Sequence, residues 1–490
     1  MIKNTINLLW LLLLFSLSTN AQSKRYWSNS FNTDANLLSG AVVGGGSGIA
    51  AIFYNPAQIA DIDYQKFAIS ANIFSLYIYR YNNALGGGDG YNDWNFKVQP
   101  RFVAFLLRPK KWESTSIELA SFTRDKVSTE LRSRNAQELD IIKSRTGNEI
   151  YLADYYYRMN YEDYWLSIGI AKKFDDKFSI GISGYHSYVS FKYDYEIDTR
   201  AFSAEPVTSD DSFYISQYKN VQSLSGYSSR LLFKLGLKYQ WRDWQFGMAV
   251  QTPSINYLGE SKVYREVSMQ NIHNQDGDLL PNMLVSEYQE ELPTAHKDPF
   301  SVAFGATYKH KNSSFYFTGE YFGKVNRYKK IEDQEPGPYV TNNIIGIRTD
   351  NWLNYYAQNN EITNVAVGYR VKLEDNIEIM SGFRTDFVYD DYDGGFDNRY
   401  PSEITSFSID QYHATVGGQF TILKTDIIAG LQYSFAIDNN LKQVANFSDP
   451  VEIIPEQRLV LQGVRNNNMG IYEHTLSLFL GFTYNIGRPN

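Results

Sequence analysis

The sequence has no cysteine, few prolines and no excess of basic side chains. Its 490 residues include 14 prolines, 46 lysines and arginines, and 54 aspartates and glutamates, for a formal net charge of −8. Without cysteine there is neither a disulfide framework nor a thiolate metal site. Because nucleic acid requires a basic surface, the acidic balance predicts no nucleic-acid partner.

Long apolar runs are also missing beyond the first residues of the chain. A membrane-spanning helix needs about twenty apolar residues, and no later stretch approaches that length. The early run from Leu8 to Phe15 follows Lys3 and is followed by small residues that include Thr19-Asn20-Ala21. This pattern is typical of a secretory signal peptide, which we assign to 1–21. A retained N-terminal anchor is the alternative.

Aromatic residues, by contrast, are abundant. They make up 16% of the chain, with 39 tyrosines and 30 phenylalanines. Tyrosine favours strands, and it suits strand ends at a membrane–water boundary because its ring is apolar and its hydroxyl is polar. The composition therefore predicts a β-protein, either soluble or embedded in a membrane.

From Lys66 onward, bulky apolar residues alternate with small or polar ones. In 165–171, for example, Leu166, Ile168 and Ile170 share one face of a strand, and small residues share the other. Each alternating segment is long enough for the roughly 9–11 residues that cross a bilayer at a tilt. The predicted strands, about fourteen and so an even number, are 66–79, 96–107, 114–124, 162–174, 178–193, 229–240, 244–258, 299–310, 313–324, 362–373, 377–388, 410–423, 426–437 and 473–486.

The connections between these strands alternate strictly between short and long. The short ones are 108–113, 174–178, 240–244, 310–313, 373–377 and 423–426, and the long ones include 125–161, 194–228, 259–298 and 325–361. Short periplasmic turns and long external loops produce this rhythm in outer-membrane barrels, whereas a soluble sandwich has no reason to place every long loop at one end. We therefore predict an all-β fold, a transmembrane antiparallel β-barrel over 66–490.

The segment 22–65 is rich in glycine and other small residues and alternates little. A barrel of about fourteen strands encloses a lumen that side chains alone cannot fill. Irregular backbone is tolerated there because it packs inside a protein wall rather than against lipid. We therefore predict that 22–65 forms an N-terminal hatch, or plug, inside the barrel.

Within this hatch, residues 48–60 read GIAAIFYNPAQIA. The stretch resembles the hatch motif of FadL/TodX-type transporters of hydrophobic compounds. In that motif an alanine-rich stretch and an aromatic pair precede Asn-Pro-Ala, which corresponds here to Asn55, Pro56 and Ala57. Segments 236–254 and 298–305 look like later strands of that family. The resemblance implies uptake of long-chain fatty acids or other apolar molecules, past a rearranging hatch and out through an opening in the third strand. No glycine in 114–124 marks such a kink, so this exit is unsupported in the sequence.

Two groups of residues are candidates for the site. Pro56 stiffens the backbone after Asn55, either as a hinge of a movable hatch or as a tight turn. A set of charged residues shares the lumen face of the strands, because a charge facing lipid costs about 2–4 kcal/mol at mid-depth. We expect these residues to form mutual salt bridges; the alternative is that a cation among them contacts a substrate carboxylate. The set consists of Lys234, Lys238, Glu320, Arg370, Glu378, Arg384 and Asp386.

Three other patterns do not predict chemistry. The glycines at 44–46 lack the Lys-Ser/Thr of a phosphate loop. His186 lies near Ser187 and Ser190, but no Ser/His/acid trio is visible, and an aromatic girdle explains the same residues. The oxygen-rich loop 390–397 lacks the closing glutamate of an EF-hand. We predict no catalytic residue, no metal and no cofactor.

The sequence thus predicts an exported protein of the outer membrane that passes hydrophobic molecules. Its expected partners are these small molecules and the lipids of the outer membrane. One alternative is a FadL-like docking barrel of a protein-secretion or envelope complex, whose long loops bind a protein. A general diffusion porin is disfavoured, because a plug blocks an aqueous channel.

Overall fold

The computed structural model describes residues 25–27, 31, 33–88, 90–109, 112, 114–203, 214–389, 402–403, 407 and 409–486. The predicted signal peptide 1–21 and the oxygen-rich loop 390–397 lie outside these residues. Within the described part of the chain, no helix has the length and apolar character needed to cross a membrane.

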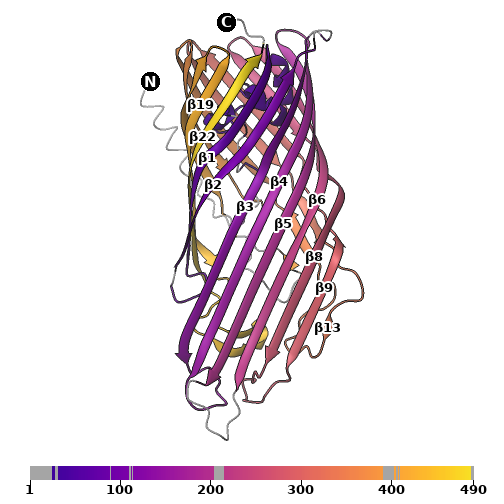
Figure 1. Ribbon diagram of the computed structural model, residues 1–490, viewed down its shortest axis with the longest axis vertical. Helices are drawn as coiled ribbons and strands as arrows, with labels where there is room; N and C mark the ends of the chain where they lie inside the picture. Colours follow the sequence, from indigo (N-terminus) through magenta and orange to yellow (C-terminus); the bar gives the residue numbers. More distant parts are fainter. Residues whose placement is uncertain are drawn as a thin grey trace.

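Fourteen antiparallel strands form a closed barrel, as predicted, and β1 pairs with β22 to complete it (Figure 1). The predicted short turns join neighbouring strands at the upper end of Figure 1. The strands are β1 (Gln65–Asn82), β2 (Gly90–Leu107), β3 (Thr115–Leu139), β4 (Glu149–Lys173), β5 (Phe178–Ser203), β6 (Ile215–Trp241), β7 (Trp244–Gln251), β10 (Ser301–His310), β11 (Ser313–Phe322), β15 (Ile362–Glu374), β16 (Ile377–Asp386), β18 (Gln411–Ile422), β19 (Thr425–Lys442) and β22 (Asn467–Ile486).

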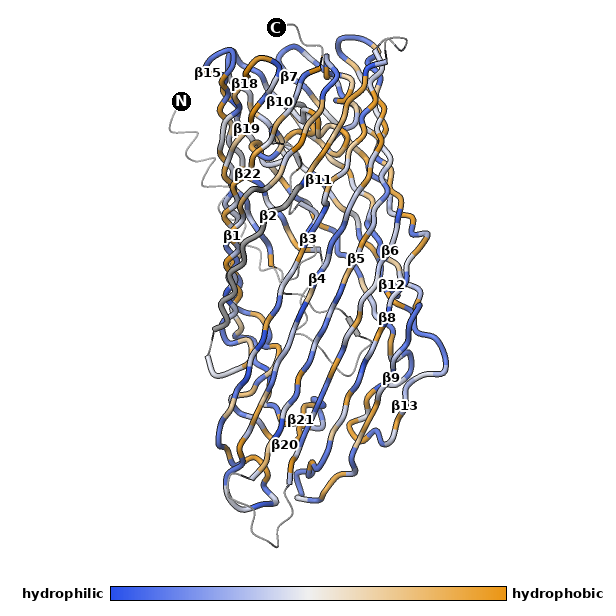
Figure 2. The backbone as a smooth tube through the Cα atoms, in the orientation of Figure 1, coloured by the Kyte–Doolittle hydropathy of each residue, from blue (hydrophilic) through white to orange (hydrophobic). Residues whose placement is uncertain are grey.

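The alternation along each strand decides which face meets lipid. In β4, Leu166 and Ile168 point outward and are 62% and 58% exposed, whereas Trp165 and Ser167 are buried on the lumen side. Exposed aromatic residues border this apolar belt, with Tyr164 toward the long loops and others toward the short turns. Such a belt between aromatic girdles is what a membrane-spanning barrel presents to the bilayer. Figure 2 follows the alternation along the strands.

The predicted long loops 125–161, 194–228 and 259–298 are mostly strand, so the prediction was wrong there. β3, β4, β5 and β6 continue far beyond the girdle, and β6 exchanges its partner β7 for β8 (Ile255–Gln270). β9 (Met283–Pro293) and the short β13 (Tyr339–Val340) extend this outer sheet. The sheet is a one-sided extension of the barrel wall toward the exterior (Figure 1).

The outer sheet has a charged convex face and an apolar concave face. Ion pairs on the convex face join neighbouring strands, including Arg134 with Asp154 and Arg158 with Asp194. The concave face is buried and rich in tyrosine. It packs against β12 (Val325–Ile331), β14 (Tyr355–Asn359), β20 (Val451–Ile454) and β21 (Leu459–Gln462). β17 (Ser402–Glu403) pairs with β14, and η3 (Pro455–Gln457) joins β20 to β21.

The hatch lies inside the barrel at the end with the short turns (Figure 1). It consists of α2 (Thr33–Leu37), η1 (Gly48–Ala50), α3 (Ala51–Tyr54) and η2 (Pro56–Asp61), joined by irregular backbone. Its apolar residues, among them Ile52 and Ile59, are buried against lumen-facing residues of the wall. Wall glycines permit this fit, since a Cβ on Gly247 would overlap the carbonyl oxygen of Val43.

Candidate functional site: a lumen cavity beside the hatch

The Asn55 side chain forms hydrogen bonds within the hatch and between the hatch and the barrel wall. Its side-chain oxygen accepts a hydrogen bond from the Ala57 amide at 3.1 Å, which caps the start of η2. Its amide nitrogen donates to the carbonyls of Val43, at 2.9 Å, and of Leu237 in β6, at 3.0 Å. Pro56 occupies the first position of η2, where a missing N–H costs nothing. The motif therefore fixes a turn and bonds it to the barrel.

We expect Asn55→Ala to loosen the hatch by about 2–4 kcal/mol, because three hydrogen bonds of about 0.5–1.5 kcal/mol each are lost in a buried place. Hydrogen exchange of the amides in η2 measures this. Asn55→Asp is the matched control, since it retains the acceptor for Ala57 but loses both donated bonds. If the η2 amides are equally protected from exchange in the unaltered protein, in Asn55→Ala and in Asn55→Asp, then Asn55 does not hold the hatch in place.

The predicted lumen cations contact the hatch or the chain before it. The Lys234 ammonium donates to the Phe53 carbonyl at 2.8 Å and lies over the Phe53 ring, and Lys238 pairs with Asp61. Arg370 lies 3.7 Å from Asp34 of α2 and 3.5 Å from Glu378 of the wall. Arg384 donates to the Trp27 carbonyl at 3.0 Å. Of the four, Lys234 lines the aromatic cavity of the lumen.

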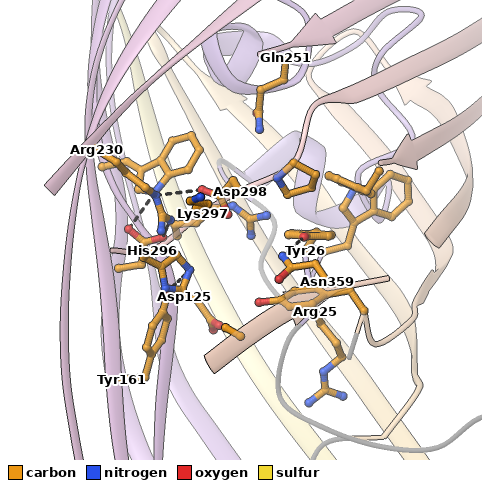
Figure 3. A pocket seen from close by; sticks show the side chains of 18 of the residues that line it. Arg25, Tyr26, Asp125, Tyr161, Arg230, Gln251, His296, Lys297, Asp298 and Asn359 are labelled. Carbon is orange, nitrogen blue, oxygen red and sulfur yellow. Dashed lines mark hydrogen bonds and ion pairs between the residues drawn. The ribbon is translucent and has the colours of Figure 1, made fainter. Parts of the chain in front are cut away.

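This cavity lies in the lumen, between the hatch and the segments that pack beneath the outer sheet (Figure 3). Its free volume of about 80 Å³ is less than the roughly 150 Å³ of an engineered cavity that binds benzene. A ligand with an aromatic ring therefore requires part of the lining to move. The lining combines cations with many aromatic rings, including Tyr26, Trp27, Phe53, Tyr161, Trp165, Phe322, Tyr328 and Tyr389.

Arg230 is the most buried charge of the lining, and it is not among the cations predicted from the sequence. Its side chain is 1% exposed and lies between Asp163, at 2.7 Å, and Asp298, at 2.9 Å. Asp163 also accepts hydrogen bonds from Trp165 and Ser187. Arg230 thereby joins β6 to β4 and to the segment that precedes β10 (Figure 3). These partners are distant in sequence, so no local pattern could predict the cluster.

The segment Arg25–Trp27 crosses the lumen beside the cavity, and we call it the strap. Arg25 donates to the Ile409 carbonyl at 3.0 Å and to Glu473 at 3.3 Å. The Trp27 amide donates to Asp386 at 2.9 Å. The Trp27 indole donates to Glu320 at 2.8 Å. The strap therefore uses acidic residues that we predicted to pair within the wall.

A second cavity lies where the wall is incompletely paired. β2 pairs with β3 only from Phe102 to Leu107, although both strands continue outward. A register shift at Thr123–Asp125 in the pairing of β3 with β4 occurs at this point, and such an irregularity bends a strand locally. The cavity beside this seam is lined by residues that include Tyr77, Arg101 and Val127.

The structure separates His186 from the serine beside it in the sequence. His186 lies on the outer face of β5 near Tyr257, whereas the adjacent Ser187 points inward and donates to Asp163. No group of three or more histidines, aspartates or glutamates suited to a metal ion occurs among the residues that the structure describes.

The closed wall, the hatch inside it and the lumen cavity define a plugged β-barrel of the membrane-spanning kind. No family model and no curated protein matches the chain. Solved structures do match it. A FadL homologue from Pseudomonas aeruginosa has a TM-score of 0.54 at 13% identity, over 95% of this chain and 100% of its own. A CymD monoaromatic hydrocarbon channel has a TM-score of 0.52 at 10% identity, over 97% and 99%.

The toluene transporter TodX from Pseudomonas putida matches with a TM-score of 0.51 at 10% identity, over 89% of this chain and 93% of its own. At these identities the likeness establishes the fold. The chain has the fold of FadL- and TodX-type outer-membrane barrels, which confirms the resemblance that the hatch motif indicated.

Proposed function

We propose that this barrel passes hydrophobic molecules passively across the outer membrane. The observation that carries the proposal is the aromatic cavity in the lumen, directly on the outer side of a hatch that fills the barrel. The solved structures of like fold include channels for toluene and other monoaromatic hydrocarbons. Burial of apolar surface, at about 0.8 kcal/mol per methylene, supplies the driving force for binding.

Both the hatch and the strap must move for a molecule to pass. The ion pairs Asp34–Arg370 and Asp61–Lys238 hold the hatch near the short turns. Of the four predicted lumen cations, Lys234 is the best placed for a substrate carboxylate, because it lines the cavity and donates to a backbone carbonyl. The unpaired seam between β2 and β3 offers a lateral route toward the bilayer.

The proposal is tested on the barrel purified from outer membranes in a mild detergent. Native mass spectrometry, followed by solvent extraction, should identify a co-purified apolar molecule. We expect the double variant Asn55→Ala, Pro56→Ala to lose it, because the hatch no longer closes the cavity. Lys262→Ala is the control, since Lys262 pairs with Glu290 on the outer sheet, far from the cavity. A barrel that neither binds apolar molecules nor passes them into liposomes would contradict the proposal.

A docking barrel is the second candidate, and the outer sheet favours it. β3 to β6, β8 and β9 build a large external surface that passage of a small molecule does not require. A stoichiometric envelope protein in the native mass spectrum, with no apolar ligand, would favour this function. The plug disfavours a diffusion porin.

A further inference from the structure

The Tyr26 ring of the strap lies between two other aromatic rings. Its centroid is 4.2 Å from that of Phe322 and 4.4 Å from that of Tyr389, and both pairs are inclined by 22°. Two rings cannot occupy the same face at such distances, so Phe322 and Tyr389 cover opposite faces of Tyr26. The side chain is 5% exposed. This arrangement is a slot for one flat ring.

The slot also binds the hydroxyl of that ring. The Asn359 amide nitrogen donates a hydrogen bond of 2.6 Å to the Tyr26 hydroxyl, and Asn359 is itself 5% exposed (Figure 3). The three groups come from different places in the fold. Phe322 ends β11, Asn359 ends β14, and Tyr389 follows β16. The rest of the protein therefore builds this slot, and the strap contributes only its occupant.

The slot opens onto the aromatic cavity of the lumen, because Phe322, Tyr389, Asn359 and Tyr26 all line that cavity. The strap is held by hydrogen bonds and ion pairs through Arg25 and Trp27, on either side of Tyr26. Withdrawal of the strap would leave a planar apolar space with one amide donor at its edge, in continuity with the cavity.

We propose that the slot of Phe322, Tyr389 and Asn359 is a binding site for phenols, and that Tyr26 occupies it as an internal ligand. The inference rests on the proposed function, since it names the class of molecule that the lumen recognises. A hydroxylated single ring reproduces both the stacking and the hydrogen bond that Tyr26 makes. A hydrocarbon ring of the same size leaves the buried amide donor of Asn359 unpaired.

A phenol and the Tyr26 ring of the strap cannot occupy the slot at the same time, so they compete for it. The apparent affinity of the intact protein for a phenol is reduced by the fraction of molecules in which the strap is withdrawn. Removing the Tyr26 ring abolishes that competition. We therefore expect Tyr26→Ala to bind p-cresol, the side-chain analogue of tyrosine, more tightly than the unaltered barrel does.

Isothermal titration of the purified full-length barrel with p-cresol and with toluene tests the chemistry of the slot. In Tyr26→Ala we expect p-cresol to bind about tenfold more tightly than toluene, since one unpaired buried donor costs about 1–3 kcal/mol. Tyr26→Ala with Asn359→Leu is the matched variant, because leucine keeps the shape and removes the donor. We expect it to bind the two compounds equally. An unchanged preference in this double variant would overturn the assignment of Asn359.

In Tyr26→Ala the deleted ring leaves a cavity that can bind rings of any kind. A second measurement is therefore made on the unaltered barrel. Hydrogen exchange of the strap is followed by mass spectrometry with saturating p-cresol or the same concentration of toluene. We expect p-cresol to accelerate exchange of the Trp27 amide, which Asp386 otherwise protects. If p-cresol neither binds the unaltered barrel nor accelerates this exchange, Tyr26 is only an anchor of the strap and the proposal is wrong.

These outcomes are separate from those that test transport. Uptake of toluene into liposomes without any preference for phenols would overturn the slot and retain the proposed function. Binding of p-cresol in the slot without passage of any apolar molecule would overturn the proposed function and retain the slot.

Discussion

Replacing Arg230 with methionine is expected to lower the free energy of unfolding of the barrel by about 3–5 kcal/mol, the usual cost of removing one partner from a buried ion pair. Methionine keeps much of the side-chain length but leaves Asp163 and Asp298 without their cation. Both carboxylates would then lie in a low-dielectric environment without compensation. Urea unfolding of the purified barrel, followed by its mobility in electrophoresis before and after heating, measures the loss.

The matched variant removes all three charges. Arg230→Met combined with Asp163→Asn and Asp298→Asn leaves no isolated buried charge, so we expect it to recover much of the lost stability. Lys262→Ala breaks an exposed pair with Glu290 and should change little. If Arg230→Met alone is as stable as the unaltered barrel, the Arg230 cluster does not hold β6 and β4 to the segment before β10.

Gly247→Ala is expected to unseat the hatch while the barrel wall remains folded. A Cβ at Gly247 would overlap the Val43 carbonyl oxygen, which is backbone and cannot rotate away, and it would also meet the Asn55 amide. Overpacking of this kind costs about 1–3 kcal/mol. A change of that size shifts the equilibrium between seated and unseated hatch by about 5–150-fold. Osmotic swelling of liposomes in small sugars should increase accordingly.

Gly319→Ala is the control for this prediction. Gly319 lies on β11, and an added Cβ there meets only the edge of the Phe317 ring at ordinary contact distance. The same chemical change should therefore leave permeability as it was. Equal swelling rates for Gly247→Ala and Gly319→Ala would show that the close approach of the hatch to β7 does not close the channel.

The sequence predicts the wall of this protein well because a strand with two unlike faces has a period of two, whatever its neighbours are. All fourteen predicted strands are present, and Asn55 and Pro56 lie at the start of η2. The outer parts of β3 to β6 were missed for a physical reason. Outside the bilayer, the convex face bears charges such as Arg158 in place of leucine and isoleucine, so the alternation resembles that of a polar loop.

The cavity could not be predicted in the same way, because its lining comes from places far apart in the chain. Tyr26, Phe322 and Asn359 are brought together by the closed barrel and by the strap inside it. The predicted cations illustrate the same limit. Strand parity placed Lys234 and Arg370 in the lumen, with Glu378 as a wall partner of Arg370. The Phe53 carbonyl and Asp34, which also contact them, belong to the irregular hatch.

The uneven pairing of the wall also determines where it is mechanically weakest. β1 and β22, which carry the two ends of the barrel chain, pair from Gln65 to Asn82, whereas β2 and β3 pair only from Phe102 to Leu107. Rupture under lateral membrane tension, or on heating, should therefore begin at the β2–β3 seam rather than where the barrel closes. A barrel torn there would open into an intact sheet that begins with β3 and ends with β2, its closing register preserved.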